Sequence, residues 1–430
     1  MIDGKTANEI FDSIRQHVAT GTLAAGETLP PVRELATELN VNRNTVAAAY
    51  KRLVTSGLAQ SLGRNGTVIK GINAPVALEG GNPDTPLVDL SGGNPAPSRL
   101  PDLSSYFAKV NKNPRLYGDA AVSPGLKVWA SQWMQNAMPG KGEIDITSGA
   151  IDAIERLLCA HLLPGDSVVV EDPCFLSSIN MLRYAGFSAS PANVDHEGML
   201  PDQLELALQK GARAVILTPR AHNPTGCSLS ASRAAQLQEI LARYPQTLVI
   251  VDDHFALLSA CHWYPVIAKE TTHWAIVRSM SKTLGPDLRL AIVASDPVTS
   301  GKLRLRLNSG SQWVSHLLQD LACACLSDET YQHTLAQTQQ FYAVQQQKLN
   351  SALRQHGIEL PVGDGLNLWL PLADHSQEIA FALAKSGWLV REGEVFGVNT
   401  PAHGLRITLS TLEDSDIDKL AVDIHQALKR

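Results

Sequence analysis

Short apolar runs alternate with amphipathic segments through most of the chain after residue 87. Five of these runs have the length of buried strands, at residues 168–170, 214–217, 248–251, 275–277 and 291–294. Their alternation with helical segments predicts a mainly parallel sheet covered by helices. Ligands of such sheets bind beyond the carboxyl ends of the strands, so polar residues that directly follow the runs are candidates for one shared site.

The first 70 residues predict three helices followed by a two-stranded wing, which is a winged helix-turn-helix. Apolar residues recur at helical spacing within these helices, and Asn42 can cap the third of them. The predicted elements are helices at residues 6–19, 32–39 and 43–56 and a hairpin at residues 58–69 with Asn65-Gly66 at its tip.

Composition and charge agree with a chain of more than one domain. The chain has 430 residues, of which 44% are hydrophobic and 18% are charged, and its formal net charge is −6. The first 70 residues carry eight Lys/Arg and six Asp/Glu, which leaves +2 on this part and −8 on the remainder. This asymmetry allows a nucleic-acid-binding head on an acidic body.

The cysteines and the apolar runs bear on the cellular location. Six scattered cysteines show no metal-ligand spacing and fit a reducing compartment. The N-terminus is polar, and no apolar run approaches the length of a membrane span. The sequence therefore predicts a cytoplasmic protein with no metal site and no membrane segment.

The stretch from Ser279 to Arg289 carries the main candidate chemistry, because it places Lys282 between two predicted buried strands. Burial disfavours the ammonium form and lowers the pKa of a lysine, and the free amine can then attack an aldehyde to form a Schiff base. The hydroxyls of Ser279 and Ser281 and the guanidinium of Arg289 suit a phosphate. A surface loop with an ordinary lysine is the alternative for this stretch taken alone.

This stretch resembles the lysine segment of fold-type-I enzymes that use pyridoxal 5'-phosphate (PLP), which reads Ser-x-Ser-Lys-x-x-x-Pro-Gly-x-Arg. The match departs at Asp287, where glycine is usual. The resemblance implies that Lys282 is the catalytic lysine and holds PLP as a Schiff base, with Ser279, Ser281 and Arg289 near the phosphate.

Other segments resemble further cofactor motifs of these enzymes. Ser148, Gly149 and Ala150 begin an amphipathic helix whose free N–H groups suit a phosphate, with plain helix capping as the alternative. Phe175 follows the strand at 168–170 and is the candidate to stack on the cofactor ring, with a core position as its alternative. Asn223, in the sequence Asn-Pro-Thr-Gly, would by resemblance bond the phenolic oxygen of PLP.

The strand at 248–251 leads into Asp252-Asp253-His254. Alternation along a strand places Asp252 and His254 on one face and Asp253 on the other. By resemblance Asp252 keeps the pyridine nitrogen of PLP protonated, which makes the ring an electron sink; a surface acidic pair is the alternative. His254 stands where the family usually has a tyrosine, and this departure weakens the expectation of efficient catalysis.

Two more residues complete the predicted site. Arg406, in the predicted strand Gly404-Leu-Arg-Ile-Thr-Leu409, resembles the family arginine that binds a substrate carboxylate bidentately, with a structural salt bridge as the alternative. Tyr117 resembles a tyrosine that reaches the phosphate from the neighbouring subunit, and the resemblance therefore implies a homodimer.

The head resembles the GntR family of transcription regulators. The segment from Gly26 to Leu53 matches Gly-x-x-Leu-Pro-x-x-Arg-x-Leu-Ala-x-x-Leu-x-Val-x-Arg-x-Thr-Val-x-x-Ala-Tyr-x-x-Leu almost without a gap. In such heads the start of the third helix enters the major groove of double-stranded DNA. The residues implied to contact bases or phosphates are Arg33, Asn42, Arg43, Asn44, Thr45 and Arg64. A protein-interaction domain with a solvated basic face is the alternative.

A GntR-like head at residues 1–70, a Gly/Pro-rich linker at 71–86 and an aminotransferase-like body at 87–430 resemble the MocR subfamily of bacterial regulators. The expected body is a fold-type-I α/β domain with a smaller α+β C-terminal domain. The first functional hypothesis is a regulator that senses PLP and controls vitamin B6 metabolism. The second is an aminotransferase with weak or residual activity, and the third is a binding module that uses the fold without a cofactor.

Overall fold

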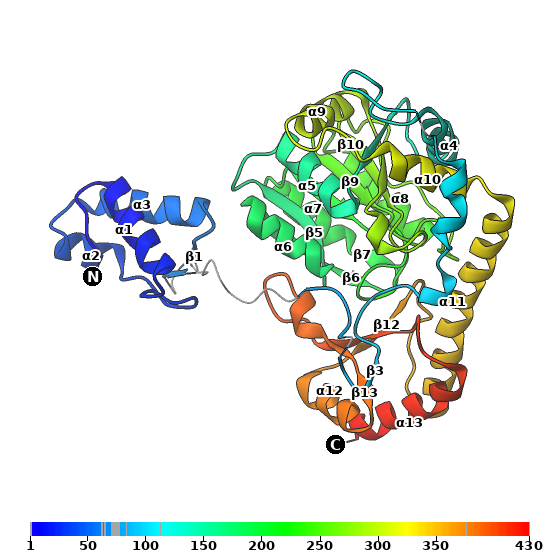
Figure 1. Ribbon diagram of the computed structural model, residues 1–430. Coiled ribbons are helices and arrows are strands. Elements are labelled where there is room, and N and C mark those ends of the chain that lie inside the picture. Colours follow the sequence, from blue (N-terminus) through cyan, green and yellow to red (C-terminus); the bar gives the residue numbers. More distant parts are fainter. Residues whose placement is uncertain are drawn as a thin grey trace. The chain divides into compact units, whose positions relative to one another are not determined.

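The computed structural model describes residues 2–61, 63, 66–69, 78–82, 84–111, 113–374 and 376–429. The chain divides into two compact units, one formed mainly by residues up to 78 and one formed mainly by residues from 79 onward (Figure 1). Arg64 and Asn65 of the predicted wing, and half of the predicted linker, lie outside the described residues.

The first unit contains the three helices and two strands that the sequence predicts. Its elements are α1 (Ala7–Ala19), α2 (Val32–Glu38), α3 (Arg43–Thr55), β1 (Ala59–Ser61) and β2 (Thr67–Ile69). Thr6 and Glu9 form a capping box at the start of α1, and the Asn42 side chain accepts a hydrogen bond from the Asn44 N–H at 2.8 Å to cap α3. β1 and β2 pair antiparallel. The helices share a core that includes Ile10, Ile14, Leu35, Val46 and Leu53.

The second unit is built on an eight-stranded sheet with the order β4-β11-β10-β9-β8-β5-β6-β7. Its strands are β4 (Glu143–Thr147), β5 (Ser167–Asp172), β6 (Ser188–Asp195), β7 (Gly198–Met199), β8 (Ala214–Leu217), β9 (Leu248–Asp252), β10 (Trp274–Ser279) and β11 (Ala291–Ser295). β5, β8, β9 and β10 run parallel, whereas β11 is antiparallel to both β10 and β4. All five predicted runs form strands, and the mainly parallel sheet is confirmed.

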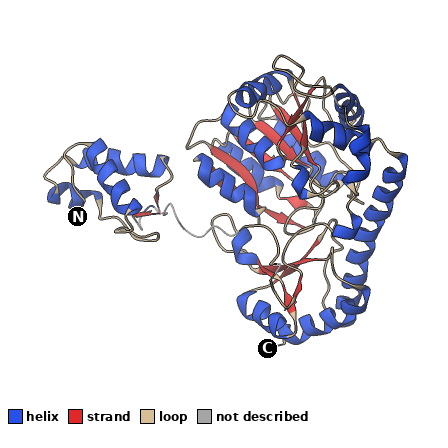
Figure 2. Ribbon diagram, in the orientation of Figure 1, coloured by secondary structure: helices blue, strands red, loops and turns tan. Residues whose placement is uncertain are grey.

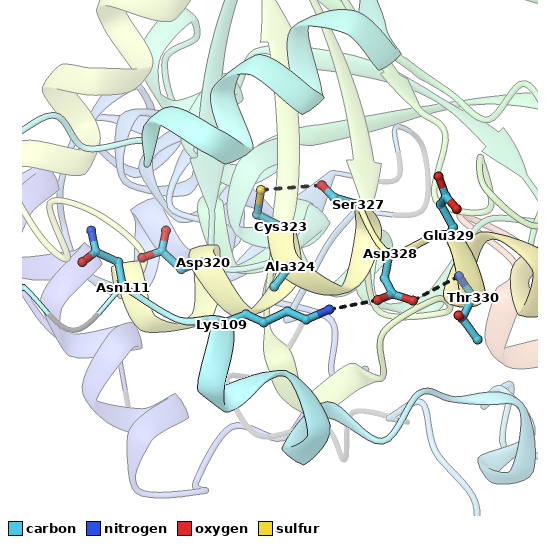
Figure 3. A pocket seen from close by; sticks show the side chains of 9 residues that line it. All are labelled: Lys109, Asn111, Asp320, Cys323, Ala324, Ser327, Asp328, Glu329 and Thr330. Carbon is cyan, nitrogen blue, oxygen red and sulfur yellow. Dashed lines mark hydrogen bonds and ion pairs between the residues drawn. The ribbon is translucent and has the colours of Figure 1, made fainter.

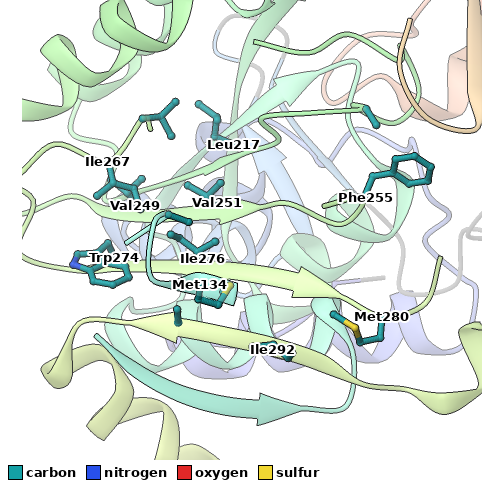
Figure 4. Close-up of a cluster of buried hydrophobic side chains, with 14 of the residues drawn as sticks. Met134, Leu217, Val249, Val251, Phe255, Ile267, Trp274, Ile276, Met280 and Ile292 are labelled. Atoms are coloured by element: carbon teal, nitrogen blue, oxygen red, sulfur yellow. The ribbon is translucent and has the colours of Figure 1, made fainter. Parts of the chain in front are cut away.

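Helices cover the sheet, as Figure 2 shows. They are α4 (Pro124–Met134), α5 (Ala150–His161), α6 (Leu176–Ala185), α7 (Pro201–Gln209), α8 (Ala231–Ala242), α9 (Pro297–Asn308) and α10 (His316–Leu326). Every residue of β9, β10 and β11 is buried, because both faces of these central strands are covered. Val249, Val251, Ile276 and Ile292 belong to the resulting core (Figure 4).

A smaller part of this unit is formed mainly by residues after the 27-residue helix α11 (Glu329–Gln355), joined by a short strand near residue 88. One sheet has the order β12-β15-β14, and another pairs β13 with β3. The elements are β3 (Val88–Asp89), β12 (Asn367–Pro371), α12 (Ser376–Lys385), β13 (Trp388–Leu389), β14 (Arg391–Glu392), β15 (Gly404–Thr408) and α13 (Ile417–Leu428). This part has its own core around Leu349, Leu368, Ile407 and Ile424. Among the helices that the structure describes, none has both the length and the apolar character needed to cross a membrane.

Candidate cofactor site and DNA-binding head

A cavity of about 490 Å³ lies beyond the carboxyl ends of the central strands of the sheet. The predicted cofactor residues that line it are Ala150, Phe175, Asn223, Asp252, His254, Ser279, Ser281, Lys282 and Arg289. The residues after β5, β8, β9 and β10 meet here because parallel strands end at the same edge of a sheet. The fold thus brings together side chains that are more than 100 positions apart in the sequence.

A more voluminous hollow, of about 670 Å³, lies near the start of α11 and has a different character (Figure 3). Its one lysine is already paired, since Lys109 Nζ lies 2.9 Å from Asp328 Oδ2, and Asp328 also caps α11. None of the predicted cofactor residues lines it. The chemistry therefore points to the smaller cavity.

Lys282 lies just after β10, and its Nζ donates a hydrogen bond to the Gly93 carbonyl at 2.5 Å. Burial lowers the pKa of the ammonium group to about 8, whereas the nearby Glu79 carboxylate raises it and the Arg406 guanidinium lowers it. About a tenth of this lysine is therefore a free amine at pH 7, far more than at the ordinary pKa of a lysine. The free amine is the form that attacks an aldehyde.

One end of the cavity offers donors for a phosphate. Gly149 precedes α5 with φ of 102°, and a Cβ at this position would lie 2.6 Å from Arg289 Nη2. Glycine is therefore needed there for backbone conformation and for the close approach of Arg289. Arg289 donates to the Ser148 carbonyl at 3.2 Å, and the Ser279 hydroxyl donates to Ser281 Oγ at 3.0 Å. With the free N–H groups at the start of α5, these groups form a cationic, donor-rich cradle.

Another part of the cavity presents an unpaired carboxylate. Asp252 ends β9 and is buried, and its Oδ1 has no hydrogen-bond partner among the described residues. Burial raises the pKa of Asp252 to about 7, and repulsion from Asp253 adds to the effect. A buried carboxylate without a partner is costly. A protonated ring nitrogen would supply the missing donor, so the residues fit a pyridinium ring.

Asp253 points to the opposite face from Asp252, as strand alternation predicts. Its carboxylate accepts from Arg220 Nη2 at 2.7 Å and from Arg278 Nε at 2.9 Å, and all three residues are buried. Trp263 lies under both guanidinium groups. This buried ion cluster anchors the end of β9 and so holds Asp252 and His254 at the cavity. Burial lowers the pKa of His254 to about 4, which keeps its imidazole neutral.

Arg406 lies on β15 and is 0% exposed. Its Nη1 and Nη2 donate to the two carboxylate oxygens of Glu79, each at 2.9 Å. Nη1 also donates to Asn223 Oδ1 at 2.9 Å, and Nη2 donates to the Ser91 carbonyl at 2.6 Å. The arginine predicted to bind a ligand carboxylate therefore holds a carboxylate of its own chain.

The predicted DNA contacts belong to the first unit, and Tyr117 belongs to the second unit but does not line the cavity. Arg33, Asn42, Arg43 and Asn44 are exposed, and Thr45 is half-buried. Tyr117 is 84% exposed, and its ring packs edge-on against Trp313 rather than lining the cofactor cavity. A single chain therefore leaves Tyr117 outside the site, and its predicted reach into a neighbouring subunit stays a prediction.

Two family models match separate parts of the chain. The model for bacterial regulatory proteins of the gntR family matches residues 6–69, and the model for aminotransferase class I and II matches residues 86–424. The vitamin B6 salvage pathway transcriptional repressor PtsJ of Salmonella typhimurium is 76% identical over 430 residues, which cover 100% of both chains. The probable rhizopine catabolism regulatory protein MocR of Rhizobium meliloti is 23% identical over 389 residues, 81% of this chain and 77% of that protein. This chain belongs to the MocR subfamily of GntR-type regulators.

Solved structures agree with this assignment of the body. The kynurenine aminotransferase of Pyrococcus horikoshii gives a TM-score of 0.71 at 21% identity, covering 80% of this chain and 91% of that one. The α-aminoadipate aminotransferase LysN of Thermus thermophilus gives a TM-score of 0.68 at 21% identity, covering 80% and 92%. These likenesses show that the body of this MocR-type regulator has the fold-type-I aminotransferase fold.

Sequence reasoning missed several residues that matter in this regulator. Glu79 falls in the predicted linker at 71–86, yet residues 79–82 make hydrogen bonds to residues of the body. Behind Asp252, Glu171 accepts from the Thr218 N–H at 3.0 Å and lies 3.4 Å from His222. Burial raises the pKa of Glu171 to about 8 and lowers that of His222 to about 3, so both are neutral. Only the family motif Asn-Pro-Thr-Gly, which directly follows His222, gave a signal near this pair.

Proposed function

We propose that this chain is a transcription regulator that binds PLP through Lys282 and binds operator DNA through its N-terminal head. The observation that carries the proposal is the cavity, which combines a lysine of lowered pKa, a buried aspartate with an unpartnered oxygen and a cradle for a phosphate. The same chain carries a GntR-type head. Because the relative PtsJ is named as a repressor of the vitamin B6 salvage pathway, we propose that this protein also controls vitamin B6 metabolism, in the cytoplasm.

Each part of the cofactor has a matching group in the cavity. When bound, PLP supplies an aldehyde for covalent attachment and a ring that withdraws electrons. Lys282 would provide the amine, and Asp252 would hold a proton on the ring nitrogen. Ser148, Gly149, Ala150, Ser279, Ser281 and Arg289 provide the donors for the phosphate. Phe175 would stack on the ring and Asn223 would donate to the phenolic oxygen, and His254 lines the same cavity.

DNA recognition is assigned to the start of α3. Asn42, Arg43 and Asn44 are exposed there, which leaves their donors free to meet base edges and phosphates. Arg33 on α2, which is also exposed, is proposed to bind the DNA backbone. Arg64, outside the described residues, is proposed as a wing contact. A homodimer with twofold symmetry, to which Tyr117 contributes, would present two heads to two half-sites.

Operator binding measured with and without PLP tests this function. DNA sites are first selected from a random library by the protein itself, and binding is then measured by fluorescence anisotropy at fixed salt. We expect PLP to change the affinity for the selected site by about 5-fold to 150-fold, the usual range of coupling between two sites. Equal affinity at all PLP concentrations would contradict the sensor, because a ligand shifts only equilibria in which it prefers one state.

Replacing Arg43 by alanine is expected to weaken binding to the selected site by about 1–3 kcal/mol, because a bidentate contact to guanine is worth this much. The measurement compares selected and unrelated DNA under the same salt conditions. Arg15→Ala is the matched control, since Arg15 is an exposed arginine on α1 that pairs with Asp12. An equal loss on unrelated DNA would place Arg43 on a phosphate instead of a base.

The alternative of a working aminotransferase draws on the presence of Lys282, Asp252 and Arg406. Two features of the cavity argue against it. His254 stands where the family has a tyrosine, so the hydroxyl that assists the catalytic lysine is replaced by a neutral imidazole. The substrate-carboxylate position on Arg406 is filled by Glu79.

A further inference from the structure

We propose that Glu79 is a built-in ligand of Arg406 that occupies the position of a ligand carboxylate and must be displaced before a small carboxylate, such as that of an amino acid or a keto acid, can bind beside PLP. This inference rests on the proposed function only in placing the second ligand in the same cavity. In this proposal, a residue of the predicted linker determines which ligands this regulator binds.

The geometry is that of ligand recognition. Both oxygens of Glu79 accept from separate terminal nitrogens of Arg406 at 2.9 Å, which is the fork-to-fork arrangement that gives arginine its preference for carboxylates. The same two nitrogens also donate to Asn223 and to the Ser91 carbonyl, and these body residues fix the orientation of the guanidinium. Arg406 is thus oriented by the body, and only the carboxylate comes from residues 79–82, here called the Glu79 strap.

Glu79 differs from a purely structural partner in its exposure and in its position. Its side chain keeps 20% of its surface exposed and lines the cavity together with Lys282, whereas Asp253 in the buried ion cluster is fully enclosed by two arginines. A carboxylate that borders the cavity can leave toward water. Arg406 has no such route, because it is 0% exposed.

The Glu79 strap is tied to the body by a small set of polar contacts. The Gly80 carbonyl accepts from Arg391 Nη2 at 2.9 Å, and the Asn82 N–H donates to Asp89 at 2.6 Å. The strap passes so close to the body that a Cβ on Gly92 would lie 2.9 Å from the Gly81 nitrogen. These contacts hold Glu79 at Arg406. Because they involve only residues 80–82, another carboxylate could replace Glu79 without any unfolding of the sheet.

Exchange conserves the charges that matter in the buried site. An incoming carboxylate would replace one anion on Arg406 by another, so the buried guanidinium stays paired throughout. Glu79 would pass into water, where an ionised carboxylate is well solvated. The same step removes a neighbouring anion from Lys282 and supplies another in its place. Ligands without a carboxylate have nothing to offer Arg406 and would leave Glu79 seated.

Succinate titrated by calorimetry into the cofactor-free protein tests the inference, with succinamide as the neutral control. We expect Glu79→Gln to bind succinate at least about tenfold more tightly than wild type, because the internal competitor has lost its charge. Asp84→Asn, which removes an exposed carboxylate from the same region, should leave the affinity unchanged. Circular dichroism establishes that each variant is folded. Equal affinity of Glu79→Gln and wild type would overturn the proposal.

Hydrogen exchange on the wild-type protein gives a second test that needs no variant. Saturating succinate should speed exchange at the Asn82 N–H and its strap neighbours, whereas succinamide should not. Unchanged exchange under saturating succinate would also overturn the proposal. PLP attachment, measured separately by its visible absorbance, reports on the proposed function: a protein that ignores PLP but passes both succinate tests would refute the sensor and leave the role of Glu79 intact.

Discussion

Replacing Lys282 by alanine is expected to abolish the visible absorbance that wild-type protein gains with PLP. In wild type this absorbance should disappear on borohydride reduction, and the variant should show neither change. The amine is the only group of this residue that can join the aldehyde, and its pKa of about 8 provides free amine near neutral pH. The phosphate cradle and Asp252 remain, so the variant retains weak, non-covalent binding of PLP. The measurement is an absorbance titration followed by mass spectrometry after reduction.

Lys127→Ala is the matched control, because Lys127 is an exposed lysine on α4 of the same unit. It should take up PLP like wild type. If Lys282→Ala were still labelled covalently after reduction, the attachment point would be another lysine and the assignment would fail. In operator binding, the response to PLP should disappear in Lys282→Ala and persist in Lys127→Ala, which links the body to the head.

Much of the cavity was predictable because its residues follow strands. The run at 248–251 predicts a buried strand, and alternation then puts Asp252 and Asp253 on opposite faces, as the unpaired Asp252 and the ion-paired Asp253 now show. The same logic placed Lys282 beyond β10. Local pattern suffices in these cases, because burial and strand period act over a few residues.

Glu79 could not be found in the same way. It lies among glycines and prolines that indicate a connector, and its partner Arg406 is 327 residues away in sequence. No periodicity or motif reports a contact of that range; only the path of the folded chain brings the two together. The partners of Asp253 were hidden for the same reason, since Arg220 and Arg278 follow or lie within other strands and carry no local signal of pairing.

Replacing Asp253 by asparagine is expected to lower the melting temperature of the cofactor-free protein by roughly 5–10 °C. The variant leaves Arg220 and Arg278 buried with no anion between them, and removing one partner from a buried ion pair costs about 3–5 kcal/mol. Asparagine keeps the size of the side chain, so the loss reports charge rather than volume. The measurement is thermal denaturation followed by circular dichroism.

Asp84→Asn serves as the control, because it removes an exposed carboxylate that borders solvent and should shift the melting temperature little. An Asp253→Asn protein as stable as wild type would mean that the two arginines find other partners or reach water.

The variant also separates stability from cofactor chemistry. Removing the negative charge of Asp253 lowers the pKa of Asp252, so Asp252 stays ionised to lower pH and its pairing with a protonated ring nitrogen is retained. Folded Asp253→Asn protein should therefore still attach PLP through Lys282, since Asp253 supports the site from behind and does not touch the cavity.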